Sequence, residues 1–100
     1  MAVDGTIFKN KVAYAVNYDI NDTDASNHIQ MLIDAGIDDM LKAGVPETVF
    51  AVDNSPLVIA TLVIFVNDNL NMTSGKHTMS LSYIANVDKL RSIPVVEVVL

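Results

Sequence analysis

The chain has 100 residues, 51% of them hydrophobic, which is enough for one domain with a genuine core but not for two. Its formal net charge of -6 disfavours binding to nucleic acid, and its six basic residues are scattered along the chain, so no basic surface for nucleic acid or an anionic membrane is expected. Cysteine is absent, which excludes disulfides and thiolate metal sites.

A first helix is predicted from about Thr6 to Val16. Thr6 can cap its exposed N–H groups. Apolar side chains recur near helical spacing at Phe8, Val12, Ala15 and Val16. The following residues, 17–22, are dense in turn formers whose side chains compete with helical backbone bonding, so we expect the helix to end there.

The clearest periodicity in the chain predicts a second helix. Apolar residues recur at spacings of one, three or four at Ile29, Leu32, Ile33, Gly36, Ile37, Met40 and Leu41. Asp22, Thr23 or Asp24 can cap its start, where carboxylates also favour the positive end of the helix dipole. Gly44 followed by Pro46 is the order that ends helices.

A connection over residues 47–54 leads to Ser55-Pro56, which predicts the start of a third helix that runs to about Leu70. This helix is apolar on almost every side, so we expect it to lie centrally or at a subunit contact. Its β-branched residues leave a strand as the alternative. The residues singled out as core or subunit contacts are Leu57, Leu62 and Phe65.

Two segments bear on targeting. Met1–Lys11 carries Asp4 and has no apolar core of signal-peptide length, so export by that route is not expected. The longest apolar stretch, Leu57–Val66, is interrupted only by Thr61 and is about half the roughly 20 residues that a membrane-spanning helix requires. We therefore expect a buried helix there.

After the polar residues 67–76, a fourth helix is predicted from Ser80 or Ser82 to Arg91. One apolar face of this helix carries Ile84, Val87 and Leu90. The fold class expected for the whole chain is mainly α, a small four-helix bundle over residues 1–92 with an extended C-terminal β-forming arm over residues 93–100.

The C-terminal arm is an apolar run with one charge: Ile93, Pro94, Val95, Val96, Glu97, Val98, Val99 and Leu100. Valine and isoleucine suit a half-buried strand, and such a segment aggregates unless something covers it. Because the rest of the chain predicts helices and offers no sheet, we expect the arm to pair with a strand of another subunit. The alternative is an edge strand folded back on the chain's own body.

Two histidines and an acidic run are the candidate metal ligands of the chain. His28 and His77 lie in different segments and are interpreted as surface histidines. The acidic run after residue 18 resembles the start of a calcium loop, but Asp24 stands where that loop needs glycine and Gln30 where it needs glutamate. A capped, solvated helix start is the favoured interpretation of Asp19, Asn21, Asp22 and Asp24. No metal ion or cofactor is expected.

Catalytic chemistry is not favoured either. Asp34 and Asp38 are one helical turn apart, and Asp39 follows, but all three lie off the apolar stripe, where carboxylates stay solvated. The serines have no histidine at motif spacing, and no glycine-rich phosphate loop is present. We therefore expect a protein that is not an enzyme, although a pocket assembled from distant residues stays open.

Taken together, these segments resemble the head-tail connector, or adaptor, proteins of long-tailed bacteriophages. The matching pieces are Asp22-Thr23-Asp24 ahead of Ile29-Gln30-Met31-Leu32-Ile33-Asp34-Ala35, then Ser55-Pro56-Leu57-Val58-Ile59-Ala60, then Val87-Asp88-Lys89-Leu90-Arg91. The resemblance covers about Asp19 to Ser92. One departure concerns the end of the third helix, where the family often carries an aromatic residue, an asparagine and an arginine, and this chain has Asn67-Asp68-Asn69-Leu70-Asn71.

The resemblance implies a virion protein, made in the host cytoplasm, that forms a homo-oligomeric and dodecameric ring at the head-tail interface. Its implied partners are the portal protein, bound through the C-terminal arm, and a head-closure (stopper) or tail-completion protein. A small acidic regulatory protein of the antitoxin or inhibitor kind, which masks a partner through its apolar tail, is the alternative.

Overall fold

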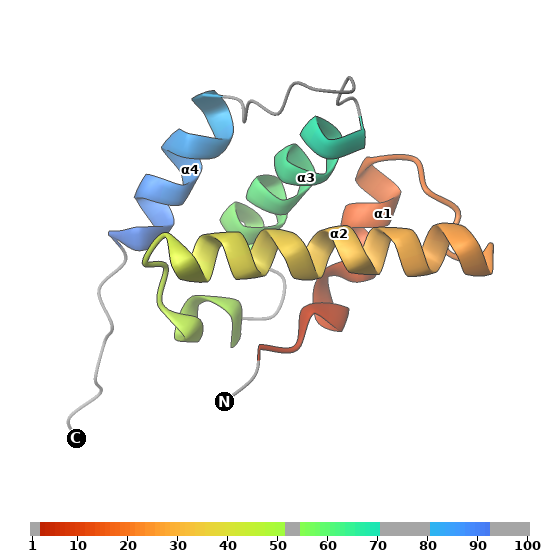
Figure 1. Cartoon of the computed structure of the whole chain (residues 1–100), viewed down its shortest axis with the longest axis horizontal. Coiled ribbons are helices and arrows are strands. Elements are labelled where there is room, and N and C mark those ends of the chain that lie inside the picture. Colours follow the sequence, from red (N-terminus) through yellow and green to blue (C-terminus); the bar gives the residue numbers. More distant parts are fainter. Residues whose placement is uncertain (1–2, 52–54, 71–80, 93–100) are drawn as a thin grey trace.

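The structure, a computed structural model of the chain, describes residues 3–51, 55–70 and 81–92 (Figure 1). Four α-helices account for most of these residues: α1 (Lys9–Ala15), α2 (Thr23–Lys42), α3 (Pro56–Leu70) and α4 (Leu81–Arg91). Two short 3-10 helices, η1 (Gly5–Phe8) and η2 (Glu47–Ala51), complete them, and the described part of the chain contains no strand. The mainly helical prediction is confirmed at this level, whereas the arm, Ile93–Leu100, lies outside the described residues.

The first predicted helix is in fact two elements, η1 and α1. Thr6 does not cap them: the Asp4 carboxylate caps η1, since its Oδ1 atom accepts a hydrogen bond of 3.0 Å from the Thr6 backbone N–H. A carboxylate is a stronger acceptor for helical N–H groups than a hydroxyl is, and Thr6 already lies inside the first turn. The change of helix type also shifts the buried face, so that Ala13 is buried and Ala15 is exposed, contrary to the prediction.

The second predicted helix is confirmed as α2. Of the three candidate caps the molecule uses Asp22, whose Oδ1 atom accepts from the N–H groups of Asp24 and Ala25 at 2.9 and 3.2 Å. At the other end Gly44 adopts a φ of 103°, and the Val45 N–H reaches back to the Met40 carbonyl at 3.0 Å. This left-handed glycine closes the helix as predicted.

The core lies where α2 and α3 cross. Gly36 allows this close approach, because a Cβ atom on it would lie 2.9 Å from Phe65 Cδ1 and 3.1 Å from Leu62 Cδ2. The buried residues of α2 are Ile29, Ile33, Gly36, Ile37 and Met40, which confirms the predicted stripe, with Leu32 and Leu41 half-buried at its edges.

The third predicted helix is confirmed as α3, and it is central, because α1, α2 and α4 all pack against it. The strand alternative is wrong: burial on three sides outweighs the low helix propensity of its β-branched residues. Thr61 is fully buried and satisfies its hydroxyl by donating to the Leu57 carbonyl at 2.6 Å. None of the helices in the described ranges is both long enough and apolar enough to span a membrane.

Two further predictions need correction. The connection predicted over residues 47–54 contains η2, which buries Val49 and Phe50; such a short 3-10 turn has no helical periodicity that a sequence pattern could reveal. In α4 the buried face consists of Tyr83, Val87 and Leu90, whereas Ile84 is 48% exposed. Tyr83 can be buried in place of Ile84 because its hydroxyl forms a hydrogen bond with Asp39 on α2.

Candidate functional site

The residues predicted as functional fall into two groups. The arm residues Ile93, Val95, Val96, Glu97, Val98, Val99 and Leu100 lie outside the described residues. The three predicted contact residues of α3 lie in or beside the core: Leu62 is fully buried, Phe65 is buried and Leu57 is half-buried. Leu62 and Phe65 are therefore core residues of the single chain.

Helix α4, which precedes the predicted arm, is hydrogen-bonded to α2 near both of its ends. Near the start of α4 the Tyr83 hydroxyl donates a hydrogen bond of 2.6 Å to Asp39 Oδ2, and its ring lies 5.5 Å from the Phe65 ring. In the last turn Arg91 Nη1 lies 3.4 Å from the Ala43 carbonyl oxygen, at the negative end of α2. The last turn of α4 is thus held beside the C-terminal end of α2.

Tyr83 has an unusual ionisation equilibrium. Burial, then the hydrogen bond to Asp39 and the negative charge of that carboxylate, raise the pKa of Tyr83 well above its ordinary 10.0. The folded chain therefore keeps this phenol protonated at pH values where the unfolded chain loses the proton. The stability that this group contributes is complete below about pH 10 and is lost as the pH rises above that value.

We expect Tyr83→Phe to remove part of the alkaline loss of stability. At about pH 8 the variant should be less stable than the parent by about 1 kcal/mol, because the hydrogen bond to Asp39 is gone. At about pH 11 this difference should shrink or reverse, since only the parent bears the cost of keeping a phenol protonated. Urea unfolding at both pH values measures it, and Tyr14→Phe, at an 86% exposed tyrosine, is the matched control that should show no such change.

The carboxylates of α2 are exposed, as predicted, but one has a role that was not foreseen. Asp38 forms an ion pair with Lys42 at 2.8 Å, and Asp34 accepts from Gln30 Nε2 at 3.0 Å. Asp39 instead joins α2 to α4 through Tyr83, which lies 44 residues away in the sequence. A pattern within one helix carries no signal for a contact of that range.

Two of the acidic residues that resembled a calcium loop accept hydrogen bonds from backbone N–H groups, one in a turn and one at the start of α2. Asp19 Oδ1 accepts the Asn21 N–H at 2.9 Å, and Asp22 caps α2. Among the described residues, no group of three acidic, histidine or cysteine side chains is placed to hold a metal ion. His28 is exposed, with its Nδ1 atom 3.2 Å from the Tyr18 hydroxyl, and His77 lies outside the described residues.

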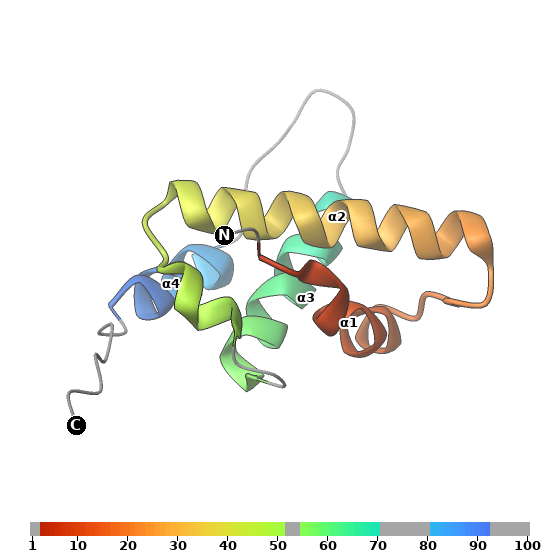
Figure 2. The ribbon, with the colours of Figure 1, turned by 90° about the horizontal axis from the view of Figure 1, so that it is seen from below.

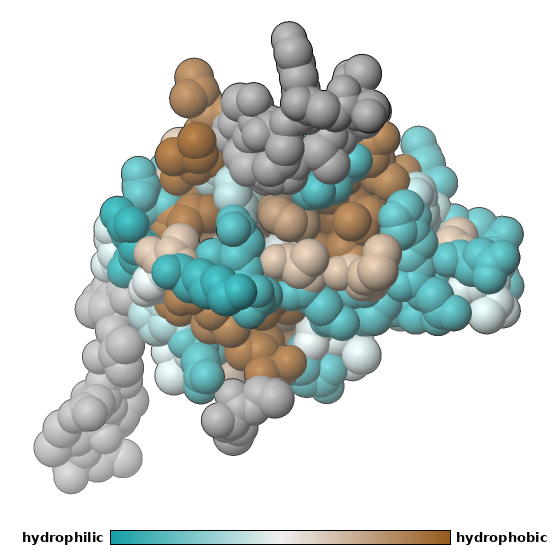
Figure 3. All heavy atoms as spheres, in the orientation of Figure 1, coloured by the Kyte–Doolittle hydropathy of each residue, from teal (hydrophilic) through white to brown (hydrophobic). Residues whose placement is uncertain are grey.

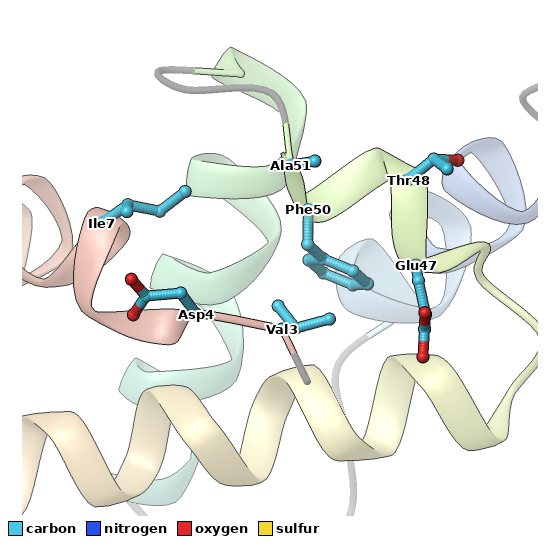
Figure 4. A pocket seen from close by; sticks show the side chains of 7 residues that line it. All are labelled: Val3, Asp4, Ile7, Glu47, Thr48, Phe50 and Ala51. Carbon is cyan, nitrogen blue, oxygen red and sulfur yellow. The ribbon is translucent and has the colours of Figure 1, made fainter. Parts of the chain in front are cut away.

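A pocket of about 360 Å³ opens between the N-terminal segment and η2. Figure 4 shows its lining, which is Val3, Asp4, Ile7, Glu47, Thr48, Phe50 and Ala51. Apolar side chains make up most of the wall, and the carboxylates of Asp4 and Glu47 lie on opposite sides of Val3. Hydrogen bonds from the Thr6 hydroxyl and backbone lower the pKa of Asp4 below its ordinary value. We call this pocket the socket; its two halves are too far apart in the sequence for a local pattern to have revealed it.

An exposed apolar pair lies at the start of α4. Leu81 is 83% exposed and Ile84, three residues later, is 48% exposed. Figure 3 shows apolar atoms at the surface over this first turn of α4. Residues three apart are neighbours on a helix, so the two side chains form one protrusion, which we call the α4 knob.

Comparisons of the chain with protein-family models, with curated proteins and with solved structures find no match. What the chain does is therefore inferred from its own residues and their arrangement.

Proposed function

We propose that the chain is a structural head-tail connector of a bacteriophage virion. It would form a ring in the neck that joins the portal to a head-closure or tail-completion protein. The order of the motifs supports this proposal, because Asp22 caps α2, Ser55-Pro56 begins α3, and Lys89-Leu90-Arg91 closes α4. In this proposal the four helices act as a small bundle, residues 1–92, and residues 93–100 form an extended β-forming arm.

The observation that carries the proposal has two parts: α4 is hydrogen-bonded to α2, and an apolar sequence follows α4 directly. Tyr83 and Arg91 hold α4 against α2, so the end of the helix from which the predicted arm would follow is held on the body. The arm sequence Ile93–Leu100 offers alternating β-branched side chains that suit pairing with a partner's strand. A helical body followed by a segment that could pair with a partner's strand would suit a protein that joins two rings.

The mechanism is assembly, and the proposed protein is not an enzyme and needs no cofactor. Each body makes the same contact with the next, and closed rotational symmetry, dodecameric by resemblance, prevents open filaments. Every subunit then contributes one arm to the portal. Because the arms are linked through the ring, many weak strand pairings add up to stable attachment.

Mass measurement and imaging test this function. The purified chain, alone and with portal rings of the phage that encodes it, is run on size exclusion with light scattering and imaged by electron microscopy. A connector should be a monomer or a ring when alone and should add a ring of density below the portal. A small defined complex with a non-virion protein, without portal binding, would instead favour the masking protein of the antitoxin or inhibitor kind.

We expect added salt to promote self-association of the free chain or to leave it unchanged. Twelve acidic against six basic residues make isolated subunits repel one another at low salt, and salt screens that repulsion. Ring closure should then depend on apolar contact and on the portal as a template, with the free chain mostly monomeric. Light scattering between about 50 mM and about 500 mM salt measures this. A ring that dissolves as salt rises would show that ion pairs dominate the subunit contact, and Lys42, Lys89 and Arg91 would be the first residues to change.

A further inference from the structure

We propose that α4 opens away from the rest of the body as one unit while the other helices stay packed. The hydrogen bond between the Tyr83 hydroxyl and Asp39, which we call the latch, holds α4 closed. This movement is a property of the single chain, so it is independent of the proposed function and can be measured without a ring or a portal.

Helix α4 lies at the edge of the described body. Figure 1 and Figure 2 both show α3 between α4 and α1. Helix α4 packs mainly against α3, whereas η1, α1, α2 and α3 pack on one another without it. Departure of α4 therefore leaves the contacts among those four elements in place.

One face of α4 joins the core. Its buried residues are Tyr83, Val87 and Leu90, and the other buried hydrophobic residues belong to the stretch from Phe8 to Val66. Segments that bury few apolar side chains open at a lower free energy than the whole domain unfolds. The exposed residues of α4, which include the α4 knob, are Leu81, Ser82, Ile84, Ala85, Asp88, Lys89 and Arg91.

Two polar contacts join α4 to α2, and they differ in strength. The Tyr83 hydroxyl, on a buried residue, donates to Asp39 Oδ2 at 2.6 Å, and a hydrogen bond to a carboxylate is stronger than one between neutral groups. Arg91 Nη1 lies 3.4 Å from the Ala43 carbonyl oxygen, and the same guanidinium also pairs with Asp88 of its own helix. The latch is therefore the stronger of the two restraints.

Opening uncovers apolar surface on both sides of the contact. The Tyr83 ring lies 5.5 Å from the Phe65 ring, so separation exposes part of Phe65 on α3 together with Val87 and Leu90 on α4. Contact of that surface with water is unfavourable, so the open state is a minor population. The latch lowers this population further, because opening also breaks its hydrogen bond.

Hydrogen exchange of the full chain at single-amide resolution tests the movement. In the parent chain the hydrogen-bonded amides of α4 should share one protection factor. We expect it to be at least about tenfold below the protection factors at the centres of α2 and α3, a gap of about 1.4 kcal/mol.

Ile29→Val distinguishes opening of α4 from unfolding of the whole chain. Ile29 is fully buried and lies ten residues before Asp39, about 15 Å away along α2. Loss of one methylene there should lower protection in α2 and α3 about fivefold. Protection in α4 should stay unchanged, because the open state keeps the packing around Ile29 and is destabilised as much as the closed state.

Tyr83→Phe tests the latch, since it removes the hydroxyl and keeps the ring. Protection of the α4 amides should fall about fivefold, the effect of one hydrogen bond. Asp39→Ala should also lower it, and adding Tyr83→Phe to Asp39→Ala should lower it little further, because both changes break the same bond. Tyr14→Phe and Asp38→Ala, at exposed side chains of α1 and α2, are the matched controls and should leave exchange in α4 unchanged.

Two results would overturn the movement. One is equal protection in α4, α2 and α3 of the parent chain, and the other is a loss in α4 on Ile29→Val as large as the loss in α2. Either would show that α4 opens only when the whole chain unfolds. Unchanged protection of α4 in Tyr83→Phe would overturn the role of the latch.

Discussion

Deleting residues 93–100 is expected to abolish binding of the chain to the portal while leaving its helical body folded. Among the described residues the buried core includes residues from Phe8 to Leu90, which we expect to be sufficient for the body to fold without the arm. The arm supplies the backbone donors and acceptors that would pair with a strand of the portal. Pull-down on purified portal rings measures binding, and far-ultraviolet circular dichroism measures the helical content of the truncated chain.

Proline substitutions distinguish strand pairing from mere apolar contact. Proline at Val96 or Val98 removes a backbone N–H, so at the position whose N–H faces the partner strand it should weaken binding more than alanine does. Alanine at the same position is the matched control, because it shortens the side chain and keeps the donor. Unchanged portal affinity of the truncated chain, or loss of its helical signal, would contradict the role given to the arm.

Replacing Leu62 or Phe65 by alanine should destabilise the chain by about 2 to 5 kcal/mol. Leu62 is 0% exposed and Phe65 is 7% exposed, and both pack where Gly36 lets α2 and α3 approach. Alanine leaves a cavity that the crossing of two helices cannot close. A single small domain has only about 5 to 15 kcal/mol of stability, so either change removes a large part of it.

Urea unfolding of the isolated chain measures these losses. Tyr14→Ala, at an 86% exposed side chain, is the matched control and should change stability by less than about 0.5 kcal/mol. Losses below about 1 kcal/mol at both core positions would show that α3 is not the centre of the fold. Phe65→Ala should also loosen α4, since the Phe65 ring lies 5.5 Å from the Tyr83 ring.

Local chemistry was sufficient to predict three of the helices. The ends of α2 follow from Asp22 and from Gly44 at a φ of 103°, and its buried stripe follows from apolar spacing. The start of α3 follows from Ser55-Pro56, and α4 begins at Leu81, between the two predicted serines. Caps, turn residues and periodicity act over a few positions, so a sequence contains all the information they need.

Contacts between distant segments were not predictable in this way. Asp39 pairs with Tyr83 across 44 residues, and on α4 it is Tyr83 that is buried while Ile84 is exposed. The socket exists because tertiary packing brings Val3 and Ile7 beside Phe50. The sequence by itself determined where the α-helices lie, and the β-forming arm stays a prediction from it, whereas only the tertiary structure decided which apolar side chains stay exposed. The physical reason is that residues close in sequence decide whether a segment forms a helix. Which side chains of that helix are buried depends on the other helices that pack against it.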